Sequence, residues 1–177
     1  MLKIAVTGPE SSGKSTLCAA LAAHYHTSWV PEYARYFLTH LPREYEQSDL
    51  LTIARRQMEW ERRYARKAKE VLFCDTELLV LKIWSEVKYG NVDPWIAAAY
   101  QRRKYPLFLL CAPDIPWTDD PLREHPNAAD RAALYLRYRD ELVVKGANFV
   151  VISGADQEQR LQQAISAVDL EIARKTE

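Results

Sequence analysis

The sequence of 177 residues lacks a net charge, a close pair of cysteines and any apolar run long enough to cross a membrane. Lysine and arginine together number 24, as do aspartate and glutamate, so a dominant interaction with nucleic acid or an anionic membrane is not expected. The chain also has no basic leader followed by an apolar signal region. These absences predict a cytoplasmic protein that binds neither nucleic acid nor a membrane.

Cysteine chemistry is also scarce. Cys18, Cys74 and Cys111 lie in apolar runs without a C-x-x-C pair, and the four histidines are scattered. A thiolate metal site or a redox pair is therefore not indicated, and we expect three buried thiols. No Asn-Lys-x-Asp motif occurs in the chain, which disfavours a guanine-specific GTPase.

The most informative motif that is present is the stretch at 8–15, GPESSGKS, which fits G-x-x-x-x-G-K-[ST] in full. It follows an apolar run at 2–6 and precedes an Ala/Leu-rich helical stretch at 16–23. This context favours a phosphate-binding loop over the alternative, a glycine turn with an exposed lysine. Backbone N–H groups would then surround a phosphate at a helix N-terminus. The expected nucleotide-binding residues are Gly8, Ser11, Ser12, Gly13, Lys14, Ser15 and Thr16.

Two side chains of this loop have individual roles in the prediction. Lys14 would follow the β- and γ-phosphates with its positive charge, and the Ser15 hydroxyl would supply one oxygen ligand to Mg²⁺. The motif therefore predicts ATP and Mg²⁺ as cofactors, but it does not identify the group that receives the phosphate.

The rest of the chain alternates short apolar runs with longer helical stretches. Strands are expected at 29–30, 71–74, 106–111 and 148–152, and a helix at 48–70. Further helices are expected to start at Asp93-Pro94, at 127–130 and at 156–159. This alternation predicts an α/β fold, with a parallel sheet between two helix layers and ligands at the carboxyl ends of the strands. The length suits one domain spanning 1–177.

An acidic residue, Asp75, ends the apolar strand at 71–74, which is the Walker B arrangement. It would hold a Mg²⁺-bound water, or accept a proton from the substrate hydroxyl. The alternative is that Asp75 caps a helix that starts near Thr76. Glu77 is either a supporting acid or a charge in the first turn of that helix.

A second acid, Glu32, follows the second strand. It would face the crevice where a phosphate acceptor lies, so we consider it a candidate general base for a primary hydroxyl. Tyr33 and Arg35 are expected to contact the substrate beside it. The alternative for Arg35 is a local ion pair with Glu32 at a helix start.

A proline- and acid-rich loop follows the fourth strand and would form a lid at about 113–131. Arg123 is the preferred arginine to stabilise the transferring phosphate, and Arg131 is the second choice, although either could be a surface ion-pair partner. Trp84 and Trp95 either stack on a planar ring of the substrate or fill the core.

The predicted helix at 48–70 carries seven basic residues from Arg55 to Lys69, and Glu59, Glu61 and Glu70 are interleaved with them. A solvated face, on which basic and acidic residues are interleaved, is favoured over a surface that binds a polyanion. If the surface did bind nucleic acid, activity would fall steeply as salt rises.

Four motifs together, at 8–17, 32–35, 74–77 and 116–123, resemble the nicotinamide riboside kinase domain of bacterial NadR-type proteins. The resemblance covers nearly the whole chain and implies a P-loop kinase fold with sheet order 2-3-1-4-5. It also implies that loop 8–16 binds ATP, that Asp75 belongs to the Mg²⁺ site and that Arg123 lies on the lid. Three residues after the last strand would form the adenine edge: Ser153, Gly154 and Ala155.

The sequence departs from that family pattern at two positions. Glu77 stands where an aspartate is expected, and Pro121 stands where a glycine is expected, which predicts a stiffer lid. Because the chain begins directly at the first strand, we expect a free-standing kinase domain.

The resulting hypothesis is an ATP-dependent kinase that phosphorylates a nucleoside-like hydroxyl, with nicotinamide riboside as the preferred substrate and NAD biosynthesis as the pathway. Three alternatives remain open: another nucleoside or nucleotide kinase, a nucleotide-dependent regulatory ATPase, and a nucleic-acid end kinase. The acceptor and the oligomeric state are not determined by the sequence.

Overall fold

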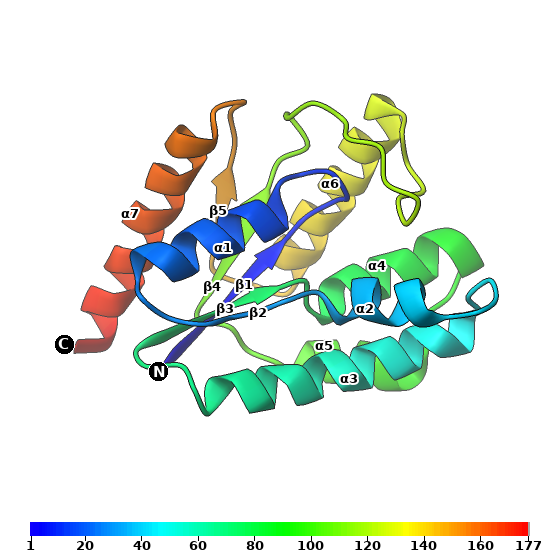
Figure 1. Ribbon diagram of the computed structural model, residues 1–177, viewed down its shortest axis with the longest axis horizontal. Helices are drawn as coiled ribbons and strands as arrows, with labels where there is room; N and C mark the ends of the chain where they lie inside the picture. Colours follow the sequence, from blue (N-terminus) through cyan, green and yellow to red (C-terminus); the bar gives the residue numbers. More distant parts are fainter. Residues whose placement is uncertain (177) are drawn as a thin grey trace.

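A computed structural model describes residues 1–176, so the last residue of the expected domain, Glu177, lies outside the described residues. Five parallel strands form one sheet in the order β2-β3-β1-β4-β5, which confirms the expected order (Figure 1). The strands are β1 (Leu2–Thr7), β2 (Trp29–Val30), β3 (Val71–Asp75), β4 (Leu107–Cys111) and β5 (Phe149–Ile152). β1 lies at the centre, paired with β3 on one side and β4 on the other.

Helices cover both faces of the sheet, as the predicted three-layer architecture requires (Figure 1). The helices are α1 (Lys14–His24), α2 (Tyr33–His40), α3 (Gln47–Ala65), α4 (Leu78–Tyr89), α5 (Pro94–Arg102), α6 (Ala128–Val144) and α7 (Gln157–Thr176). Ile4 and Val6 of β1 point toward α1 and α7, whereas Ala5 points toward the other helices. This alternation follows from the two-residue period of a strand.

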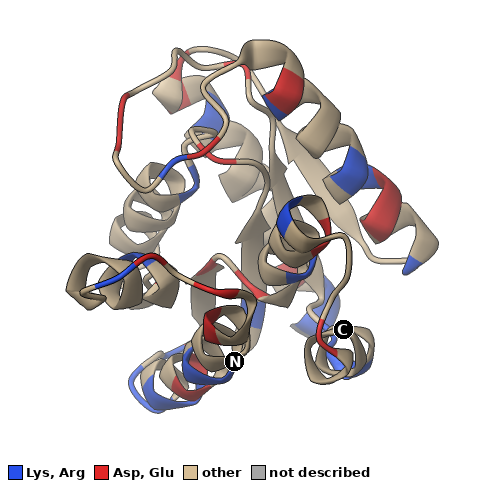
Figure 2. Cartoon of the chain, turned by 90° about the vertical axis from the view of Figure 1, so that its right-hand side faces the viewer, with Lys and Arg blue, Asp and Glu red and all other residues tan. Residues whose placement is uncertain are grey.

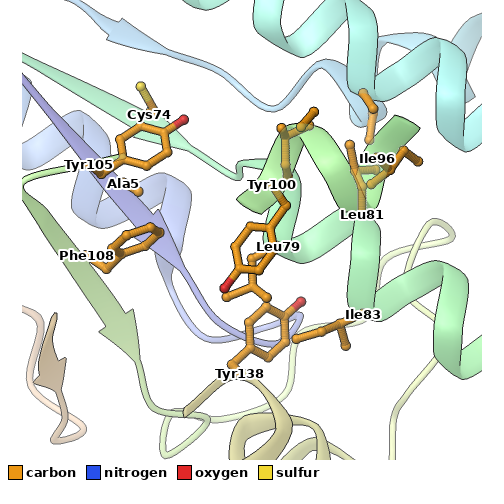
Figure 3. Close-up of a cluster of buried hydrophobic side chains, with 14 of the residues drawn as sticks. Ala5, Cys74, Leu79, Leu81, Ile83, Ile96, Tyr100, Tyr105, Phe108 and Tyr138 are labelled. Atoms are coloured by element: carbon orange, nitrogen blue, oxygen red, sulfur yellow. The ribbon is translucent and has the colours of Figure 1, made fainter. Parts of the chain in front are cut away.

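The larger core lies on the face covered by α3, α4, α5 and α6. Figure 3 shows Ala5, Cys74 and Phe108 of the sheet in one cluster with side chains of these helices, including Leu79 and Tyr138. All three cysteines are buried and unpaired, as expected. Within residues 1–176, no helix is both long enough and apolar enough to cross a bilayer.

Local signals located most helix starts correctly. Asp93 caps α5 by accepting a hydrogen bond from the Trp95 N–H, with Pro94 in the first turn, and Asn127 caps α6 in the same way. The prediction for α3 was too long at its end, because the helix stops at Ala65 rather than at residue 70. The helical spacing of apolar residues continues to Leu72, but Leu72 pairs with Lys3 in the sheet. The chain must therefore leave the helix early enough to enter β3.

Candidate active site

The phosphate-binding loop lies between β1 and α1, and its shape depends on two glycines. Gly8 has a φ of 135°, and a Cβ at this position would lie 2.6 Å from the carbonyl oxygen of Cys111. Gly13 adopts the left-handed conformation as the N-cap of α1, with a φ of 78°. Ser11 also has a positive φ, of 52°. A loop that curls in this way, ahead of a helix N-terminus, is suited to bind an anion through its N–H groups.

Lys14 and Ser15 open α1 directly behind this loop. The Lys14 ammonium group donates to the Pro9 carbonyl oxygen at 2.7 Å, and the Ser15 hydroxyl donates to Asp75 Oδ2 at 2.5 Å. Asp75 is buried, and its other oxygen, Oδ1, has no hydrogen-bond partner. Because burying an unsatisfied carboxylate oxygen is costly, this atom is suited to bind a cation or a proton.

The residues around Asp75 fit a hard divalent cation. A hydroxyl and a carboxylate are oxygen ligands of the kind Mg²⁺ prefers. Within residues 1–176 no three His, Cys, Asp or Glu side chains converge on a metal position. A Mg²⁺ ion here would therefore draw further ligands from nucleotide phosphates and water, as is usual for this ion. The alternative role of Asp75 as a helix cap is wrong, because α4 begins at Leu78 and its N-cap is Glu77.

The two acids at the end of β3, Asp75 and Glu77, have unusual protonation equilibria. Burial is the largest cause that raises the pKa of Asp75, to about 7, and the nearby charge of Glu32 raises it further. The Ser15 hydrogen bond and the charges of Lys14 and Arg35 act in the opposite direction. Burial likewise raises the pKa of Glu77 to about 7. Glu77 accepts hydrogen bonds from the Leu79 N–H and the Thr7 hydroxyl, so it serves the start of α4.

A cavity of about 670 Å³ joins the phosphate-binding loop to an apolar wall. This volume is in the usual range for small-molecule sites. Glu32, Arg35 and Arg123 line it together with the loop, so the structure brings these predicted residues into one site. The wall consists of side chains from α2, α4 and α6, namely Leu38, Val80, Ile83, Trp84, Val87, Leu134 and Tyr138.

Arg35 pairs with the lid rather than with its neighbour in sequence. Its guanidinium lies 2.8 Å from the Asp120 carboxylate, and this contact raises the pKa of Arg35 and lowers that of Asp120. The alternative of a local ion pair with Glu32 is thus wrong. Glu32 remains at the cavity, where its carboxylate can face an incoming substrate.

The lid runs as a loop from 113 to 127, and the last residues of the predicted segment belong to α6. The Arg123 guanidinium donates to the Thr118 carbonyl oxygen and lies 3.5 Å from the Ser11 hydroxyl. It is therefore placed beside the phosphate-binding loop. Arg131, the second choice, instead donates to the carbonyl oxygens of His125 and Pro126.

Glu10 was not singled out from the sequence, although it connects the lid to the phosphate-binding loop. Its carboxylate accepts from the Glu124 N–H at 2.9 Å and lies 2.5 Å from His125 Nδ1. The Glu124 side chain in turn pairs with Lys88 at 2.6 Å and accepts from the Tyr45 hydroxyl. These contacts hold the loop, the lid and α4 together. Glu10 occupies a variable position of the motif, so the motif alone gives no signal for this role.

The aromatic residues proposed for substrate binding fall into different places. Trp84 lines the cavity. Trp95 packs elsewhere, with the Arg55 guanidinium 5.1 Å from its ring, and Tyr33 packs edge-to-face on Trp60. For Trp95 and Tyr33 the structure therefore supports packing rather than substrate contact, because neither ring reaches the cavity.

The segment Ser153-Gly154-Ala155 lies outside this cavity, at the end of β5. The Gln163 side chain accepts a hydrogen bond from the Ser153 N–H and donates one to the Ser153 carbonyl oxygen. The Gly154 N–H donates to Asp114. Arg160, which was not predicted, connects this segment to the phosphate-binding loop. It pairs with Asp114 at 2.6 Å and donates to the Ser12 carbonyl oxygen at 2.7 Å. An adenine-binding role for the segment stays a prediction.

The basic residues of α3 are exposed and interleaved with acids, as blue and red segments at the bottom of Figure 2 show. Arg56, for example, pairs with Glu59 one turn further along the helix. One acidic residue of this helix does not lie on the solvated face that the sequence predicted. Glu61 is buried rather than solvated, and it accepts a hydrogen bond from Tyr105 and pairs with Arg103.

Comparisons with known proteins agree with this geometry. A family model described as an AAA domain matches residues 3–160. The chain is 28% identical over 172 residues to the trifunctional NAD biosynthesis/regulator protein NadR of Salmonella typhimurium, covering 93% of this chain and 41% of that protein. The NadR protein of Escherichia coli is 27% identical over 169 residues, with the same coverage. The chain therefore spans about two fifths of the length of these relatives.

Solved structures show the same fold. A crystal structure of NadR in complex with NR superposes with a TM-score of 0.78 at 20% identity, over 97% of this chain and 52% of that one. A deoxyadenosine kinase from M. mycoides with bound dCTP superposes with a TM-score of 0.62 at 14% identity, over 95% and 99% of the two chains. Because the family model matches most of its length, the chain belongs to the AAA domain family, with the P-loop fold that NadR and nucleoside kinases share.

Proposed function

We propose that this protein is an ATP-dependent kinase that transfers the γ-phosphate to a hydroxyl of a nucleoside-like small molecule, with nicotinamide riboside as the preferred substrate. One observation carries the proposal: a single cavity runs from the phosphate-binding loop, past Glu32, to an apolar wall that includes Trp84. Such a cavity can hold a phosphate donor at one end and a ring-bearing acceptor at the other. The similarity to NadR supports the choice of acceptor.

The residues divide the reaction between them. The phosphate-binding loop and Lys14 would bind and stabilise the transferring phosphate, and Arg123 would approach it from the lid. Glu32 would accept the proton of the attacking hydroxyl. Ser15 and Asp75 would hold Mg²⁺, whose chemistry is to neutralise charge on the phosphates. The lid contacts of Glu10 and Arg35 would exclude water and so disfavour hydrolysis of ATP.

A ligand screen followed by a turnover assay tests the proposal. Melting curves are recorded with Mg²⁺ and a nonhydrolysable ATP analogue, alone and with each member of a panel of nucleosides and pyridine nucleosides. We expect nicotinamide riboside to give the largest additional rise in Tm, because a ligand that binds only the folded state stabilises it. Phosphorylated nicotinamide riboside should then form when ATP replaces the analogue.

The same assay separates the alternatives. Phosphorylation of a different nucleoside would show that the proposed acceptor is wrong but that the protein is a kinase. That outcome is consistent with the fold shared with deoxyadenosine kinase. Hydrolysis of ATP that no acceptor stimulates would favour a regulatory ATPase and contradict the proposal. A steep loss of activity between about 50 and 200 mM salt would indicate a nucleic-acid acceptor. For a small acceptor we expect a shallow salt dependence.

Substituting Asp75→Asn should separate function from stability. The amide keeps the shape of the side chain but lacks the charge that favours Mg²⁺, so we expect the Mg²⁺ concentration for half-maximal activity to rise about 10–100-fold. Titrations of activity with Mg²⁺ measure this change. An unchanged Mg²⁺ dependence would remove Asp75 from the metal site.

Although Asp75→Asn should impair Mg²⁺-supported activity, we expect it to make the ligand-free protein more stable. The pKa of Asp75 is raised to about 7 in the folded state, from a usual value of 3.8, so ionisation of this group opposes folding. The wild type should therefore lose stability as pH rises from about 4 to 7, whereas the variant avoids this loss. At pH 8 we expect the variant to melt higher, on the order of a few degrees, with little difference near pH 4.

A further inference from the structure

Gln57 of α3 connects the two strand ends that carry Glu32 and Asp75. Its side chain is buried, with 1% of its surface exposed. Oε1 accepts from the Tyr33 N–H at 2.7 Å, and Nε2 lies 3.3 Å from the Pro31 carbonyl oxygen. The backbone on both sides of Glu32 is thus held by one amide group.

The same amide nitrogen also faces the other strand end. Nε2 lies 3.4 Å from the carbonyl oxygen of Asp75 and 3.3 Å from that of Thr76. The orientation of the amide is determined by these partners, because a flipped group would place oxygen against three carbonyl oxygens and nitrogen against an N–H. Gln57 therefore spans from the β2 end to the β3 end.

The sheet itself cannot provide this connection. β2 pairs with β3 only through Trp29 with Phe73 and Val30 with Cys74. The next residue is Pro31, which has no N–H to donate to the ladder. The backbone pairing thus stops just before Glu32 and Asp75, and the Gln57 amide takes its place.

We propose that Gln57 is a positioning residue, which sets the separation of Glu32 and Asp75 across the gap where β2 and β3 no longer pair. This inference rests on the proposed function for the roles of the two acids. A shift of about 1 Å in a reacting group can cost on the order of 10²-fold in rate. Gln57 would therefore influence the transfer step without touching the substrate.

The main test substitutes Gln57→Met, which keeps the length of the side chain and removes its hydrogen bonds. We expect kcat to fall about 10–10²-fold, while KM for ATP stays within about twofold, since the phosphate-binding loop is untouched. Gln47→Met is the matched control. Gln47 lies on the same helix but bonds Ser85 and Asn91 at the far end of α4, so kcat should be unchanged. A kcat for Gln57→Met within about twofold of the wild type overturns the proposal.

A double-mutant cycle shows whether Gln57 acts through Glu32. In a Glu32→Gln background, Gln57→Met should lower kcat by less than about threefold, because the base whose distance from Asp75 it sets has already been removed. A full additional loss in that background would mean that Gln57 acts elsewhere, and it would overturn the proposal. If Gln57→Met does not fold, Gln57→Asn replaces it in these tests, because the shorter asparagine side chain cannot reach both strand ends.

Hydrogen exchange tests the connection without any turnover. The Tyr33 N–H should be protected in the wild type and in Gln47→Met, and it should exchange much faster in Gln57→Met. Equal protection in all three proteins would overturn the proposal even if the chain proved not to be a kinase. Conversely, a loss of protection in a protein without any transferase activity would refute the proposed function and leave the strand connection intact.

Discussion

Lys14→Ala is expected to lower kcat for phosphoryl transfer by about 10²–10³-fold, the range for losing one preorganised group that stabilises transition-state charge. Lys14 opens α1 and lines the cavity together with Pro9. Within residues 1–176, the only hydrogen bond that its ammonium group makes is to the Pro9 carbonyl oxygen. The charge is therefore available for the phosphates. Steady-state kinetics with ATP and the acceptor measure the effect.

The fold should survive this substitution, because the side chain is only partly buried. We expect a Tm close to that of the wild type in the absence of ligand. Lys67→Ala, at an exposed position beyond the end of α3, controls for the loss of one positive charge and should leave kcat unchanged. Near-normal turnover by Lys14→Ala would refute the kinase assignment.

Glu32→Gln is expected to lower kcat by about 10²–10⁴-fold if Glu32 accepts the proton of the attacking hydroxyl. The amide has nearly the same shape but cannot act as a base at neutral pH. A loose, metaphosphate-like transition state would place the loss at the low end of this range. KM for ATP and the melting temperature should change little, because Glu32 forms the N-cap of α2 without a side-chain cap bond.

The competing view, in which Glu32 only pairs with Arg35, is contradicted by the structure, where Arg35 pairs with Asp120. Glu44→Gln, on the exposed loop before α3, is the matched control and should have no effect on kcat. If kcat for Glu32→Gln lies within a few-fold of the wild-type value, Glu32 is not the base. Asp75 would then be the next candidate for the base, since its pKa of about 7 lies close to neutral pH.

The sequence was sufficient wherever the determining interactions are local. Gly8 and Gly13 sit where the backbone must adopt positive φ, and the apolar runs before and after them predict a strand and a helix. The sheet order, by contrast, was expected from the family resemblance rather than from any residue pattern. The carboxyl-end rule for parallel sheets then placed Glu32 and Asp75 at one edge. The loop and its flanking elements depend on short stretches of chain, so a single sequence can reveal them, and the position of the two acids follows from the predicted parallel topology.

Only the tertiary structure decided which partner each polar side chain takes. Arg35 has Glu32 nearby in sequence but pairs with Asp120 on the lid. The helical pattern predicts Glu61 on a solvated face, but its side chain is buried against Tyr105. Gln57 belongs to no recognisable motif, yet its side chain joins the ends of β2 and β3. Periodicity and motifs describe neighbours along one element, whereas these contacts join elements that are distant in sequence. Their geometry exists only once the sheet and its helices have packed together.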